Sequence, residues 1–161
     1  EQQELQGGGQ RDWGGSDSVQ MSKMEFYDLA GSQEFTPSQW ANPGGNNPSA
    51  EGPSNLGDDS LSTKWLDFNR QNLEISFSSP VHIQSYHWGT ANDAEERDPM
   101  RWALYVMMGG TWRVVDNSAQ YTRTSTISEV HIKSVTIFTG YAVIIVSYSG
   151  WIVAVAALFA I

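Results

Sequence analysis

The feature that most constrains this chain is its C-terminal stretch, residues 134–161, which holds no charged, amide or imidazole side chain over 28 positions. As one α-helix the stretch would measure about 42 Å, and the hydrocarbon core of a bilayer measures about 30 Å. A buried strand pair or core helix is the alternative, and the β-branched run at 143–146 favours strands. Because a core element rarely needs more than about a dozen uninterrupted apolar positions, we expect one transmembrane helix over 134–161.

Small residues recur along that expected helix at positions i, i+3, i+7 and i+10, which places them on one stripe. A second helix can approach such a stripe closely, so we expect a helix-packing interface with other membrane-protein subunits at Ser147, Gly150, Ala154 and Ala157. Contacts with a pigment or a lipid are candidate cofactor contacts of the same helix. His131, just before the helix, is a candidate ligand for a pigment or a metal, although a lone histidine is more often structural.

Composition limits the kinds of partner that the rest of the chain can bind. Lys and Arg number 9 against 18 Asp and Glu, which gives a formal net charge of −9. Such a surface repels phosphate backbones and anionic lipid headgroups, so nucleic acid is excluded as a partner. The chain has no cysteine, which excludes disulfides, thiolate metal sites and a cysteine nucleophile.

Two signals bear on membrane orientation, and they conflict. Lys133 and Arg123 precede the apolar stretch and nothing basic follows it, which favours a cytoplasmic or stromal position for the soluble part. The sequence begins with Glu1 rather than methionine, which indicates a removed leader and the opposite side. We expect the soluble part on the lumenal or extracytoplasmic side.

Before residue 134 the chain reads as short strands between turn-rich loops. Residues 73–77 alternate with period two, and Gly109-Gly110 is a two-residue hairpin turn between strands expected at 102–107 and 111–115. The Pro- and Gly-rich residues 42–53 predict a long structured loop. We therefore expect a mostly β protein, with a Gly-rich segment at 1–16, a β-sandwich at 17–132 and the transmembrane helix at 134–161.

Residues 11–130 resemble a known family. The matching segments are 42–53, 58–69, 73–80, 90–93, 97–99 with Trp102, and 110–112, and the run from Asn-Pro-Gly-Gly at 42–45 to Thr-Lys-Trp at 63–65 is the most specific. They look like a discoidin-type domain of the algal or protist kind, the galactose-binding-like domain also called the coagulation-factor C-type domain. The resemblance implies a jelly-roll β-sandwich.

The resemblance also implies a structural calcium ion, for which Asp58 and Thr63 would be ligands. This sequence departs from the family pattern at Asp59, where the pattern has glycine, and at Lys23, where a glutamate is common. A lysine near a calcium position repels the ion or replaces its charge. The alternative is an aspartate pair that caps a turn without a metal.

Sugar-binding relatives use loops at one end of the sandwich, and the corresponding candidates here are His87, Arg97, Asp98 and Trp40. The simpler interpretation of Arg97 and Asp98 is a salt bridge within the loop. Signatures of catalysis, such as His-Glu-x-x-His, Gly-x-Ser-x-Gly or a phosphate-binding loop, do not occur in the sequence.

We therefore expect a non-enzymatic, single-pass membrane protein that is a structural or accessory subunit of a large complex. The algal character of the resemblance makes a photosystem–antenna assembly in the thylakoid membrane the first hypothesis. The alternative is a membrane-tethered module that binds glycans or lipid headgroups. Fold alone does not decide between them.

Overall fold

The computed structural model describes residues 16–28, 34–99, 102–118, 130–138 and 143–147. These residues form ten strands and two short 3-10 helices. In chain order they are β1 (Val19–Met21), β2 (Lys23–Tyr27), β3 (Gln39–Ala41), η1 (Pro53–Gly57), β4 (Trp65–Asp67), β5 (Leu73–Ser76), β6 (His82–Gly89), η2 (Glu95–Arg97), β7 (Trp102–Met108), β8 (Thr111–Ser118), β9 (Val130–Phe138) and β10 (Val143–Ser147). The described part of the chain is therefore mostly β, as expected.

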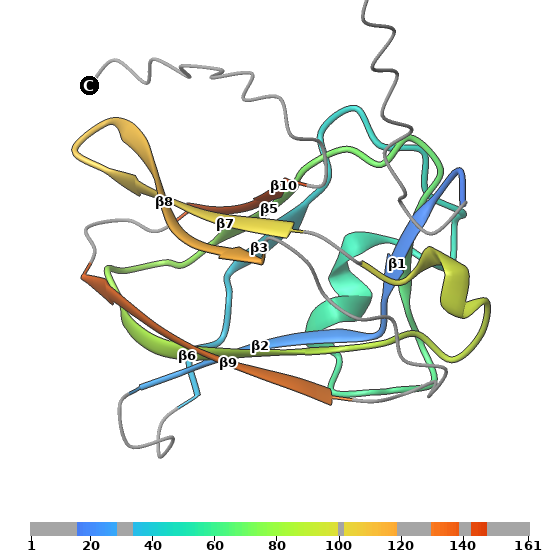
Figure 1. The fold of residues 1–161 in the computed structure, drawn as a ribbon, viewed down its shortest axis with the longest axis horizontal. Coiled ribbons are helices and arrows are strands. Elements are labelled where there is room, and N and C mark those ends of the chain that lie inside the picture. The colour runs from blue at the N-terminus through green and yellow to red at the C-terminus, as the bar shows by residue number, and fades with distance from the viewer. Residues whose placement is uncertain (1–15, 29–33, 100–101, 119–129, 139–142, 148–161) are drawn as a thin grey trace, which may run out of the picture.

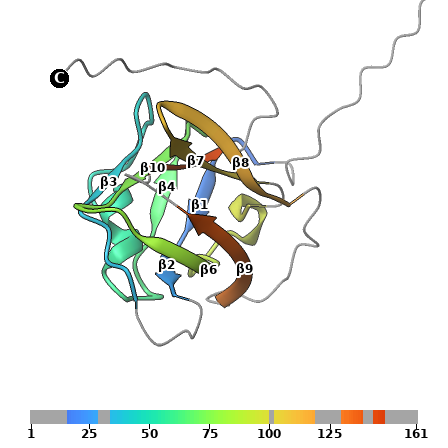
Figure 2. The same ribbon diagram turned by 90° about the vertical axis from the view of Figure 1, so that its left-hand side faces the viewer.

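The strands form two main antiparallel sheets that face each other in two layers (Figures 1 and 2). One sheet has five strands in the order β3-β5-β10-β7-β8, and the other has three in the order β2-β6-β9. The pair β1-β4 forms a third small sheet, which lies with η1 at one end of the two layers (Figure 1). Strands that are adjacent in sequence are often not adjacent in a sheet, so the topology is largely non-local.

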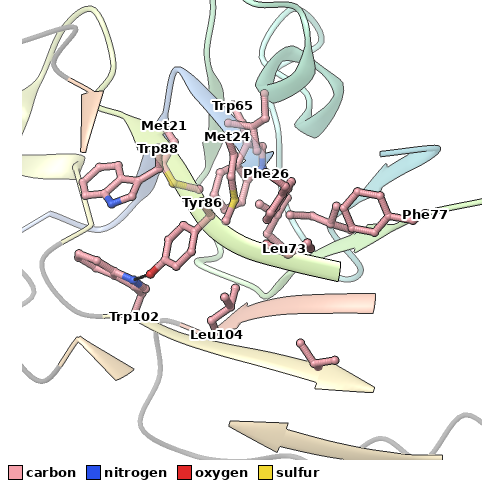
Figure 3. Close-up of a cluster of buried hydrophobic side chains, with 14 of the residues drawn as sticks. Met21, Met24, Phe26, Trp65, Leu73, Phe77, Tyr86, Trp88, Trp102 and Leu104 are labelled. Carbon is pink, nitrogen blue, oxygen red and sulfur yellow. Dashed lines mark hydrogen bonds between the residues drawn. The ribbon is translucent and has the colours of Figure 1, made fainter. Parts of the chain in front are cut away.

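The space between the layers is filled by large apolar side chains (Figure 3). Along β2, β5 and β7 alternate residues point inward, as the period of a β-strand requires. Phe26 of β2, Ile83 of β6, Ile75 of β5 and Leu104 of β7 are all fully buried. Phe26 and Phe77 meet edge to face with ring centroids 5.5 Å apart, and Trp88 and Trp102 do so at 5.2 Å.

The Pro- and Gly-rich residues 42–53 form the ordered loop that the sequence predicts, and one buried carboxylate organises much of it. The Oδ1 atom of Asp67 accepts hydrogen bonds from the backbone N–H groups of Asn46 (2.7 Å) and Asn69 (2.9 Å), and its Oδ2 atom accepts one from that of Gln71 (2.6 Å). Asn47 adds a bond from its Nδ2 atom to the Leu66 carbonyl at 2.7 Å. These bonds tie the loop to β4 and to the turn that follows β4.

The predicted helix over 134–161 is wrong for the part that the structure describes. Residues 134–138 belong to β9 and residues 143–147 form β10, which lies between β5 and β7. Valine, isoleucine and threonine dominate these segments and favour strands. Such an uninterrupted apolar run resembles a membrane helix in sequence.

This correction moves the expected domain boundary, since β9 crosses residues 132–134 and the β structure continues to Ser147. Residues 148–161 and 1–15 lie outside the described residues. Among the residues that are described, no helix has the length and apolar character needed to cross a bilayer.

Candidate functional site

The loop after η1 places the two candidate calcium ligands in direct contact with each other. Oδ2 of Asp58 accepts a hydrogen bond from the Thr63 hydroxyl at 2.7 Å, and Oδ1 accepts one from the backbone N–H of Ser60 at 2.9 Å. Asp59 adopts a left-handed backbone conformation with φ 57°. The structure thus brings Asp58 and Thr63 together, in the geometry of a side-chain-capped turn.

A lysine ammonium reaches this loop from strand β2. Nζ of Lys23 lies 2.8 Å from Oδ1 of Asp59 and 2.7 Å from Oε1 of Glu25. Burial lowers the pKa of Lys23, but its hydrogen bonds to Asp59 and Glu25 outweigh that effect and leave the pKa raised. The same hydrogen bond lowers the pKa of Asp59. Lys23 therefore supplies positive charge beside the turn where the resemblance implies a calcium ion.

Clusters of side chains that could hold other metal ions are also lacking in the described part of the chain. Within the described ranges, no group of three or more histidine, aspartate or glutamate side chains is arranged to hold a metal ion. Calcium at Asp58 and Thr63 stays a prediction, and Lys23 is the residue that opposes it.

A second ion pair joins this loop region to residues 90–98. The ammonium of Lys64, a side chain that is itself buried, binds the carboxylate of Asp93, and Nδ2 of Asn92 donates to the carbonyl of Ser62 at 2.7 Å. Nε2 of the buried Gln20 also donates to the carbonyls of Asp93 and Ala94. These polar side chains therefore bind groups of the protein itself.

The four candidate sugar-binding residues lie in different surroundings. His87 packs on Tyr27 with ring centroids 4.5 Å apart, and its Nδ1 atom lies 3.7 Å from Glu25. Trp40 packs against the core at Phe26, with a centroid separation of 6.5 Å. Asp98 is buried, and its Oδ1 atom accepts a hydrogen bond from the backbone N–H of Ala91 at 3.2 Å. Arg97 ends the short helix η2.

The structure therefore brings Arg97 and Asp98 together only as chain neighbours, and it places His87 and Trp40 elsewhere. Trp40 is half-buried and packs against the core, as is common for a large aromatic side chain, and its role in sugar binding stays a prediction.

The expected helix-packing stripe is also corrected in part. Ser147 is the last residue of β10 and pairs with Ala103 of β7, so it belongs to a strand and not to a helix. Gly150, Ala154 and Ala157 lie outside the described residues. His131 lies within β9, where its backbone pairs with Trp88 of β6.

The sequence did not reveal a row of residues that crosses all five strands of the larger sheet. In the register, Glu74 pairs with Ile145, Ile145 with Tyr105, and Tyr105 with Val114, while Ala41 pairs with Glu74 on the other side. Residues directly opposite each other in a sheet share a face. Leu104 and Val106 flank Tyr105 and point into the core, as Leu73 and Ile75 do on either side of Glu74, so Tyr105 and Glu74 lie on the outer face.

The outer face at β7 and β8 is apolar and open to solvent. Val114 is 51% exposed, the largest exposure among the large hydrophobic residues described. Tyr105 beside it is half-buried, as are Met107 and Trp112, which form the next cross-strand pair. Toward the other end of the row, next to Ala41, burial raises the pKa of Glu74. We name the row Ala41, Glu74, Ile145, Tyr105 and Val114 the outer row.

Comparison with protein-family models gives no match for this chain, and a search of curated proteins finds none either.

Proposed function

We propose that this chain is a non-enzymatic interaction module of the discoidin type, which serves as an accessory subunit of a larger membrane-protein assembly. The two facing antiparallel sheets support a sandwich of this type, and the ordered loop at 42–53 begins the run 42–65 on which the resemblance is most specific. The site argues for docking rather than chemistry.

The observation that carries the proposal is the apolar outer face of the five-stranded sheet. Val114 is 51% exposed there, next to the half-buried Tyr105, Met107 and Trp112. Aromatic residues and methionine are enriched at protein–protein interfaces, and charged residues are depleted at interface cores. An exposed apolar patch of this composition marks a surface that is covered by a partner.

The loop end of the molecule supports the same choice by its internal bonding. Lys23 binds Asp59, Lys64 binds Asp93, and Asp58 binds Thr63, so these polar groups are already satisfied within the protein. A sugar would have to compete with those bonds, and such competition lowers affinity. The separate surroundings of His87 and Trp40 point the same way.

The membrane part of the proposal rests on sequence alone. Residues 148–161 follow β10 directly and contain no charged side chain. A segment that is apolar on every side favours an environment that is apolar on every side, which a bilayer or a neighbouring membrane subunit provides. The photosynthetic assembly stays a hypothesis that depends on the resemblance.

Native electrophoresis of the tagged chain, extracted from its own cells in a mild detergent, tests the proposal. We expect the chain to migrate with a large assembly and to be released by Val114→Asp. Phe68→Asp is the matched control, because Phe68 is 47% exposed but lies outside the five-stranded sheet. A wild-type chain that migrates as a free monomer and binds immobilised galactosides would overturn the proposal in favour of a glycan-binding module.

A further inference from the structure

The outer row changes in chemical character along its length. Its β8 and β7 positions are Val114 and Tyr105, and its β5 position is the carboxylate Glu74. Neighbouring strands lie about 4.8 Å apart, so the three steps from β8 to β5 span about 14 Å. From β8 to β5 the row is therefore an apolar strip followed by one negative charge, and Ala41 of β3 lies beyond that charge.

Glu74 is half-buried and, within the described part of the chain, takes part in no salt bridge. A half-buried carboxylate beside an apolar surface is stabilised when a cation approaches it. A second copy of this chain is poorly suited to supply that cation, because the chain carries a net charge of −9 and the copies repel each other. Charge complementarity therefore points to a basic partner.

The spacing along the apolar strip fits a helix. An α-helix that lies across the strands has a pitch of about 5.4 Å, which is close to the strand spacing of about 4.8 Å. A helix lying across the strands would place apolar residues i, i+4 and i+7 over the β8, β7 and β10 positions. Its residue i+11, about 16 Å along the axis, would then lie near Glu74.

We propose that the outer row is the docking site for an amphipathic helix of a partner protein, with three apolar residues over the Val114 and Tyr105 end and a lysine or arginine that pairs with Glu74. This inference rests on the proposed function, since it specifies the partner of the same sheet face. It also identifies Glu74 as the residue that selects the partner by charge.

A pair of synthetic peptides tests the proposal. Both are 18-residue helix formers with leucine at positions i, i+4 and i+7, and they differ only at i+11, which is lysine in one and glutamate in the other. Fluorescence anisotropy measures their binding to the full chain, always in the same maltoside buffer. We expect the lysine peptide to bind about tenfold more tightly, with a preference that weakens as salt concentration rises.

Three substitutions make the test specific to the outer row. Glu74→Gln should reduce the preference for lysine to about twofold, and Glu74→Lys should reverse it, because the charge at that end changes sign. Val114→Asp should weaken both peptides by about tenfold or more, because it places a charge in the apolar contact. Glu96→Gln removes an equal charge from an exposed position in η2 and should change neither affinity.

Equal binding of the two peptides, or a lysine preference that Glu74→Lys leaves intact, would overturn the inference about charge. Affinity unchanged by Val114→Asp would overturn the choice of surface. The proposed function fails separately, when the native chain migrates alone in detergent extracts. A chain that migrates with an assembly but shows no peptide preference contradicts only the inference.

Discussion

The indole nitrogen of Trp102 donates a hydrogen bond to the hydroxyl of Tyr86 at 2.7 Å, and this bond joins the two sheets inside the core (Figure 3). The Tyr86 hydroxyl in turn donates to Oδ2 of Asp116 at 2.7 Å. Strands β7, β6 and β8 thus meet at one phenol group. Burial and the bond to Asp116 raise the pKa of Tyr86, so the phenol stays protonated and continues to donate.

Tyr86→Phe should therefore destabilise the fold by about 1–3 kcal/mol, because it removes two hydrogen bonds in a site that is shielded from water. Urea unfolding followed by tryptophan fluorescence measures the change. Tyr105→Phe, on the outer face, is the control, and we expect it to change the free energy of unfolding by less than about 0.5 kcal/mol. Equal effects of the two substitutions would show that the Tyr86 hydroxyl adds nothing to stability.

Asp67→Asn should loosen the Pro- and Gly-rich loop. The asparagine keeps one acceptor oxygen but directs an amide at a backbone N–H, so at least one of the three bonds to Asn46, Asn69 and Gln71 is lost. Hydrogen bonds to a charged group contribute about 1.5–3 kcal/mol each, so we expect a loss of about 3 kcal/mol. Asp58→Asn, on an exposed turn, is the matched control.

Limited proteolysis distinguishes a local from a global effect of Asp67→Asn. Cleavage within residues 42–53 should become faster under conditions in which the remainder of the chain stays intact. A variant that loses less than about 1 kcal/mol and keeps wild-type cleavage would show that other contacts hold the loop.

The local features of this fold were predictable from the sequence. The alternation at 73–77 gives β5, and Gly109 and Gly110 adopt φ 56° and 79°, as a tight hairpin turn between β7 and β8 requires. Both depend on residues close together in the chain. The same holds for the turn at Asp58 and Thr63.

The long-range features were not predictable. Strand β10 pairs with β5, and Val146 lies opposite Leu73, 73 positions earlier in the chain. Without knowledge of that pairing, an uncharged run of β-branched residues resembles a membrane helix. The outer row was missed for the same reason, because its five members come from five different strands and share no local pattern.

Lys23 provides a test of the calcium prediction. We expect millimolar calcium to leave the stability of the wild-type protein unchanged, because the ammonium lies beside the turn that would hold the ion. Lys23→Glu replaces that ammonium with a carboxylate near Asp58 and Asp59. With a dissociation constant of about 1 mM, 10 mM calcium would stabilise this variant by about 1.4 kcal/mol.

Thermal unfolding in calcium chloride, with magnesium chloride as the control for ionic strength, measures both outcomes. A wild-type protein that calcium stabilises, and magnesium does not, would show that Asp58 and Thr63 bind the ion despite Lys23.

Glu74 makes the stability of the protein depend on pH, and the sign of this dependence follows from the burial of its carboxylate. Because the folded-state pKa of Glu74 lies above its unfolded value, the folded state retains the proton to a higher pH. The contribution of Glu74 to stability is therefore most favourable below its ordinary pKa, and it declines as the pH rises through the raised value. At pH 7 the charged carboxylate destabilises the isolated chain.

Glu74→Gln should accordingly raise the unfolding midpoint in urea at pH 7 and have almost no effect at pH 3.5. The shift of the midpoint should be modest, because the side chain is only half-buried. Glu96→Gln should show neither change. The same Glu74→Gln substitution is expected to weaken binding of a lysine-bearing helix, so stability and partner selection should move in opposite directions. A residue with only a structural role would not separate them, and a Glu74→Gln variant that is destabilised at pH 7 would contradict this account.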